Sequence, residues 1–133
     1  MRNWLTLLAL AALLFVSTRV QAELPPGSYD TLRVEAPEAL LIEVLGVKKA
    51  AKGNATEVVA VARVLHVERT KAGLRPGAMV EIRYIHLNAP IPGPRPVPLL
   101  AEKAIVPAFL KKGEGKDFEP AAYGMSFVMT PER

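Results

Sequence analysis

Apolar positions in this sequence either run together or alternate with polar ones, in short stretches separated by turn residues. The first stretch, 40–47, is apolar at almost every position and predicts a mostly buried strand. The segment 48–56 contains Gly53-Asn54 and has the composition of a hairpin loop. In the next stretch, 57–69, apolar residues occupy both parities. We therefore expect a long strand that is covered on both sides or that changes face at a bulge.

Three further strands are predicted downstream. At the centre of 78–87 apolar residues alternate with charged ones, which is typical of a half-buried strand. The stretch 104–110 is apolar but includes Pro107, whose missing amide donor favours a sheet edge or a bulge. The stretch 121–129 closes the pattern. With no sustained helical period between or within these segments, the chain is expected to be all-β, forming a small five-stranded barrel or sandwich.

Prolines set the character of two connecting segments. Those of 23–38 are expected to exclude a helix and a central strand, so this segment is interpreted as an N-terminal arm preceding a barrel domain at 39–133. Five prolines at every second position of 88–98 predict an extended, polyproline-like loop. Such a loop is either a stiff connector, which we favour, or a preformed docking segment that exposes Arg95.

Residues 1–22 have the features of a signal peptide. Arg2 precedes an apolar run of about 12 residues, and Val20-Gln21-Ala22 suits signal peptidase. A membrane span needs roughly 20 apolar residues, so cleavage after Ala22 is favoured over a retained anchor. The mature chain is then expected in the periplasm or the external medium, with no stable membrane span.

Composition excludes several functional classes. The chain of 133 residues has no cysteine, which removes disulfides, thiolate zinc sites and a thiol nucleophile. Its net charge of +4 includes Arg2 and Arg19, so the processed chain carries only about +2, spread along its length. Nucleic acid is not an expected partner of such a chain. We expect a monomer held together by its hydrophobic core.

The order of features between residues 39 and 129 also carries a resemblance. A buried strand and hairpin are followed by the turn Leu74-Arg75-Pro76-Gly77, and Leu99-Leu100 precedes the strand 104–110. This order resembles the netrin-module and tissue-inhibitor-of-metalloproteinase-like branch of OB-fold barrels, and the closing segment 120–127 is similar to that of bacterial exported proteins of this shape. The resemblance implies a Greek-key OB-like barrel. It does not imply the inhibitors' mechanism, because they chelate an enzyme's zinc through an N-terminal cysteine that this chain lacks.

Catalytic chemistry has little support in the sequence. His66 and His86 lie near the ends of neighbouring predicted strands and could offer two metal ligands, completed by Glu68 or Glu81. A catalytic zinc normally takes three protein ligands, however, and no serine lies in a nucleophile elbow. A small metal-dependent or hydrolytic enzyme using the two histidines is therefore the alternative, while no cofactor and no metal are expected.

The favoured function is that of a non-enzymatic binding module for a protein or another envelope component. OB-like barrels commonly bind through the face of their second and third strands and the adjoining loops. The competing interpretation is that the arginines of this face only pair with Glu57, Glu68 or Glu81 on neighbouring strands. The candidate binding residues are Arg63, His66, Arg83, Tyr84, His86 and Arg95.

Overall fold

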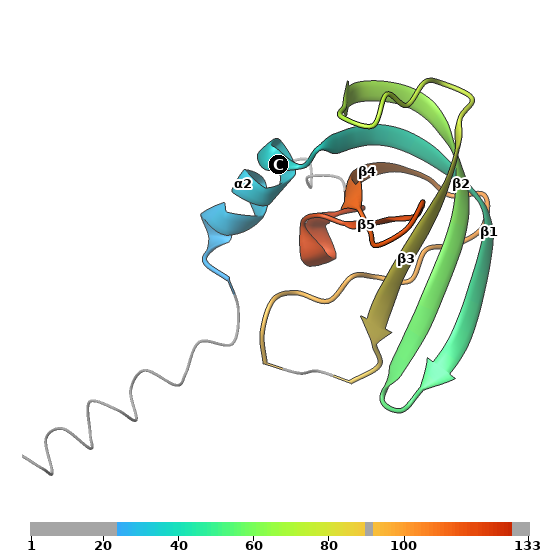
Figure 1. Ribbon diagram of the computed structural model, residues 1–133. Helices are drawn as coiled ribbons and strands as arrows, with labels where there is room; N and C mark the ends of the chain where they lie inside the picture. Colours follow the sequence, from blue (N-terminus) through green and yellow to red (C-terminus); the bar gives the residue numbers. More distant parts are fainter. Residues whose placement is uncertain (1–23, 90–91, 129–133) are drawn as a thin grey trace, which may run out of the picture.

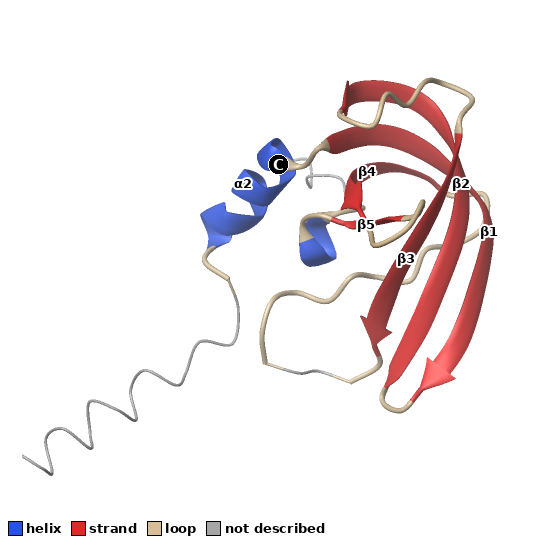
Figure 2. Cartoon of the chain, in the orientation of Figure 1, coloured by secondary structure: helices blue, strands red, loops and turns tan. Residues whose placement is uncertain are grey.

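The predicted strands close on themselves. The computed structural model describes residues 24–89 and 92–128, and these form a closed barrel in the order β1-β2-β3-β5-β4 (Figure 1). The prediction of an all-β fold with a small five-stranded barrel is confirmed, and this strand order is compatible with an OB-like fold. One α-helix and a 3-10 helix accompany the strands (Figure 2). In chain order the elements are α2 (Pro26–Glu35), β1 (Glu38–Lys52), β2 (Ala55–Thr70), β3 (Met79–Leu87), β4 (Ile105–Lys112), β5 (Phe118–Pro120) and η1 (Tyr123–Met125).

The long strand β1 has two neighbours. It pairs antiparallel with β2 along its whole length, but with β4 only over Glu38–Glu43. β3 continues the sheet on the far side of β2 and meets β5 in parallel at Ile82 and Phe118. The antiparallel pair β4 and β5 completes the closure.

The barrel interior is filled by aliphatic side chains of one parity on each strand. Val58, Ala60, Ala62 and Val64 of β2 are completely buried and meet inward residues of β1 and β3. The two alanines suit the limited width of a five-stranded barrel, whose interior is filled by side chains. Burying each valine or isoleucine contributes about 1.5–3 kcal/mol, so this core can stabilise a chain without disulfides. Its other fully buried aliphatic members are Ile42, Val44, Ile82, Ala108 and Leu110.

A bulge in β2 accounts for the inward position of Val67, whereas Val61, of the same parity, is exposed. Opposite the bulge on β1, Ile42 pairs with Val64 and Leu41 pairs with His66, so Leu65 is an extra residue in the ladder. Consequently Leu65 and His66 are both exposed, whereas Val67 returns to pack against the core. Of the two explanations that the sequence offered, the structure shows the bulge.

The N-terminal arm contains a helix, so the prediction that its prolines exclude one is wrong. α2 begins at Pro26, in the first helical position, where the missing amide proton costs nothing and the fixed φ suits the helix. The helix ends before Pro37, which cannot continue it. Arg69 holds the C-terminal end, because its guanidinium donates to the carbonyls of Ala36 at 2.8 Å and Arg33 at 2.9 Å. The prolines therefore delimit the helix.

The extent of the first hairpin loop was also predicted wrongly. β1 continues to Lys52 and β2 begins at Ala55, so the turn consists of Gly53 and Asn54 alone. Gly53 takes a φ of +61°, which glycine adopts without a steric penalty. Because lysine and alanine are weak strand formers, composition suggested a loop where the ladder with β2 imposes a strand.

The fifth strand lies outside the predicted stretch 121–129. β5 is Phe118–Pro120, and the residues after it form η1 and an irregular segment packed against the barrel. Tyr123 has a φ of +46°, which interrupts an extended chain. Ala122 and Phe127 are nevertheless buried. The apolar pattern of this stretch therefore indicates a segment that packs against the barrel without forming a strand.

The predicted signal peptide, residues 1–22, lies outside the described residues. Within those residues no helix has the length and the apolar character that crossing a membrane requires.

Candidate functional site

The outward-facing residues of β1, β2 and β3, together with Ile105 of β4, make up a surface that we call the outer face. Register places Ile105, Glu43, Arg63 and Met79 side by side across four strands. Arg63 lies 3.6 Å from Glu43, and their side chains are 49% and 32% exposed. Arg63 thus pairs across strands, but with a partner that the sequence did not indicate.

Arg83 lies on the same face and binds Glu81, two residues away on β3, at 2.9 Å. Glu81 is one of the three glutamates of the competing interpretation, but it lies on the same strand as Arg83, so the predicted pairing across neighbouring strands is wrong for Arg83. Both side chains remain about half exposed. An exposed ion pair of this kind contributes only about 0–1 kcal/mol, so its partners can be exchanged at little cost.

Exposed apolar side chains surround these charges. Met79 and Ile105 are each 53% exposed, and Ile85 is 44% exposed. Sequence analysis did not identify this set, although the alternation of β3, with Val80 and Ile82 inward, already implies that Met79 and Ile85 point outward. The exposed large apolar residues of the outer face are Leu45, Val61, Leu65, Met79, Ile85 and Ile105.

Tyr84 does not belong to the outer face. Its ring is buried in the core, and its hydroxyl donates to the carbonyl of Pro98 at 2.8 Å while accepting from the amide of Leu100 at 3.0 Å. Burial raises the pKa of this hydroxyl, and the hydrogen bond from Leu100 partly opposes the rise. Tyr84 therefore binds the C-terminal end of residues 92–100, which we call the proline-rich segment, to the barrel.

His86 and Arg95 contribute to the same attachment. His86 Nδ1 lies 2.8 Å from the carbonyl oxygen of Val97. The amide of Arg95 donates to the hydroxyl of Tyr29 on α2 at 2.7 Å, and its carbonyl accepts from the amide of Gly124 at 2.8 Å. Backbone groups of the segment 92–100 are thus bound to α2, β3 and η1.

Arg95 also has a side-chain environment of its own. Its guanidinium lies 5.6 Å from the centre of the Tyr29 ring, and Nη1 lies 3.3 Å from the sulfur of Met125. A Cβ on Gly124 would approach Arg95 Cγ to 2.5 Å, which accounts for a glycine at this contact. Arg95 is exposed, yet its side chain packs over α2 and η1.

The two histidines are not brought together. His86 pairs with Thr56 at one end of β2, whereas His66 lies ten residues further along the same strand, about 30 Å in an extended chain. The expectation of two imidazoles meeting across adjacent strands is therefore wrong. Among the described residues no group of three histidine, aspartate or glutamate side chains could hold a metal ion.

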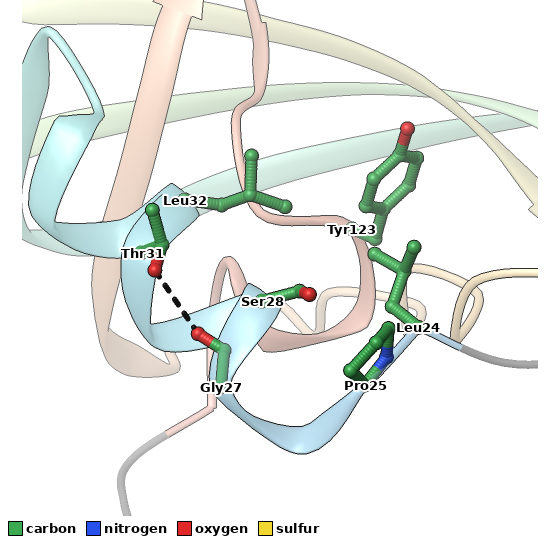
Figure 3. A pocket seen from close by; sticks show the side chains of 7 residues that line it. All are labelled: Leu24, Pro25, Gly27, Ser28, Thr31, Leu32 and Tyr123. Carbon is green, nitrogen blue, oxygen red and sulfur yellow. Dashed lines mark hydrogen bonds between the residues drawn. The ribbon is translucent and has the colours of Figure 1, made fainter.

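A mostly apolar cleft of about 620 Å³ lies where α2 meets η1. Figure 3 shows Leu24 and Tyr123 near Ser28 and the first turns of the helix. Thr31 donates its hydroxyl proton to the Gly27 carbonyl at 3.1 Å. The described residues that line this cleft include no acid, imidazole or ammonium. No sequence pattern indicated this cleft, because it depends on α2, a helix that was not predicted. The lining residues are Leu24, Pro25, Gly27, Ser28, Thr31, Leu32 and Tyr123.

Comparison with protein-family models, with curated proteins and with solved structures found no match to this chain. The geometry of its own residues is therefore the basis for assigning a function.

Proposed function

We propose that this protein is an exported, non-enzymatic binding module that recognises a protein or another envelope component through its outer face. The observation that carries the proposal is the composition of that face: six large apolar side chains remain exposed around the ion pairs of Arg63 and Arg83. Apolar side chains gathered around arginines are typical of protein interfaces, where arginine and methionine are enriched.

Five of the six candidate binding residues fall into two groups under this proposal, while Arg95 packs against Tyr29 and Met125. Arg63, His66 and Arg83 remain available to a partner on the outer face. Tyr84 and His86, by contrast, bind the backbone of the proline-rich segment. We expect their loss to act on folding, and on recognition only indirectly.

The proposal includes an OB-like barrel of the netrin-module type, placed outside the cytoplasm by cleavage after Ala22. The strand order supports the barrel, and the apolar run of the leader supports export. The absence of cysteine means that recognition would differ from that of the cysteine-dependent metalloproteinase inhibitors. We expect it to use side chains of the sheet surface.

Site-specific photo-crosslinking in the producing cell tests the outer face directly. A photoreactive phenylalanine analogue replaces Met79 in one variant and Val34 in the control, both exposed apolar residues, the second on α2. We expect a discrete adduct from position 79 and at least fivefold less from position 34. Combining the position 79 probe with Arg63→Ala and Arg83→Ala should reduce the adduct. Equal yields from the two positions would argue against the proposal.

A further inference from the structure

One edge of β1 is open beyond the point where β4 leaves it. β4 pairs with β1 only up to Glu43, and the last backbone contacts on that side join Val44 to Ala104 and Lys103. From Leu45 to Lys52, β1 continues to pair with β2 on its other side. Among the described residues, the backbone makes no further hydrogen bond along this outer edge. On this side of residues 45–52 the amides and carbonyls that alternate with those directed at β2 have no described strand beside them (Figure 1).

The charge of this edge is of one sign. Between Glu43 and Glu57 the only charged residues are Lys48, Lys49 and Lys52, and all three are exposed. Register places Lys48 and Lys52 on one side of the sheet and Lys49 on the other. No ion pair within the described part of the chain involves these lysines. Glu57, the nearest acid on β2, lies opposite Ala50.

These two observations select the kind of segment that can pair with the edge. A second copy of the chain would bring its own three lysines against these three, which opposes self-association. An extended peptide with acidic residues at alternate positions meets Lys48 and Lys52 with opposite charge while its backbone continues the sheet. We propose that β1 residues 45–52 form a strand-addition site for an extended acidic peptide segment.

This inference does not depend on the function assigned to the outer face. That face presents side chains projecting from the sheet, whereas strand addition uses backbone groups in the plane of the sheet. Variants at Met79 and probes of the β1 edge therefore give separate results. Failure of one proposal leaves the other standing.

The test uses an acetylated, amidated octapeptide of alternating glutamate and threonine, added to the isotopically labelled protein. We expect amide chemical-shift changes centred on residues 45–52 and amide deuterium exchange slowed at least threefold there. The triple variant Lys48→Gln/Lys49→Gln/Lys52→Gln should raise the dissociation constant of the peptide at least tenfold. The matched control Lys111→Gln/Lys112→Gln/Lys116→Gln removes the same charge elsewhere and should change it less than twofold.

A second peptide separates strand addition from simple charge attraction. Replacing each threonine by proline keeps the charges and an extended shape but removes the backbone donors at those positions. Strand addition predicts that this peptide loses at least tenfold in affinity. The proposal is overturned if both peptides bind equally or if the acidic peptide shifts no amide of residues 45–52. It is also overturned if sedimentation shows a dimer and the amide shifts on dimerisation locate its contact at residues 45–52.

Discussion

Polar side chains have different bonding partners in two regions of this molecule. On the outer face, Glu43 and Arg63 meet each other while remaining accessible to solvent. A second set, which we call the backbone-binding network, consists of Glu38, Arg69, Tyr84 and His86, whose side chains bind main-chain atoms. A side chain that satisfies a backbone group cannot be removed without leaving that group unpaired. The network therefore stabilises the fold, while the outer face is free to exchange its partners.

The two glutamates of β1 give the largest expected contrast. Glu38 is 1% exposed and accepts hydrogen bonds from Thr70, Lys71 and Ala72 at 2.7–3.0 Å, holding the chain after β2. Glu38→Ala removes all three acceptor contacts and should lower the free energy of unfolding by about 3 kcal/mol, because three hydrogen bonds to a carboxylate are lost and their partly buried donors lose their acceptor. Urea denaturation monitored by circular dichroism measures the loss.

The control for this variant is Glu43→Ala. Its side chain is 32% exposed and, within the described part of the chain, forms one ion pair, with Arg63 at 3.6 Å, so we expect a change of about 0.5 kcal/mol or less. Similar denaturation midpoints for the two alanine variants would contradict the division between network and outer face.

Tyr84→Phe should have the next largest effect. The substitution keeps the ring against Phe127, 6.0 Å away between centroids, but removes the hydroxyl that joins Pro98 and Leu100. We expect a loss of about 1–3 kcal/mol in the free energy of unfolding. Faster amide exchange at Leu100 would show that the segment has been released locally. Unchanged exchange there would mean that other contacts hold it.

The same hydroxyl predicts a dependence on alkaline pH. Burial raises the pKa of Tyr84 in the folded chain above the ordinary value of 10.0. Its contribution is therefore fully present below about pH 10, the pKa of the unfolded chain, and is lost as pH rises through the higher folded value. The denaturation midpoint should fall above pH 10 in the wild type and fall less steeply in Tyr84→Phe. Parallel profiles would show that Tyr84 does not account for the change.

How much of this could be predicted from the sequence differs between the two regions. Alternation in 78–87 correctly identified a half-buried strand, because its side-chain period follows from pleating alone. The alternation could not show that Tyr84 and His86 bind the backbone of the proline-rich segment. These residues and that segment meet only when the chain folds. The proline pattern was interpreted as excluding a helix, although a proline suits the first helical position, as Pro26 shows. A bulge in 57–69 was one of two expectations, but its position at Leu65 is set by the register with β1.

Paired arginine variants give the smallest expected change in stability and the sharpest test of the outer face. Arg63→Ala and Arg83→Ala each break one ion pair between side chains that are roughly a third to a half exposed, so each should cost about 0.5 kcal/mol or less. Because the two pairs share no side chain, their effects on unfolding should add. If the outer face binds a partner, the double variant loses recognition while its free energy of unfolding falls by only about 1 kcal/mol or less. If the free energy of unfolding of the double variant instead falls by several kcal/mol, both arginines stabilise the fold, as Glu38 and Tyr84 do.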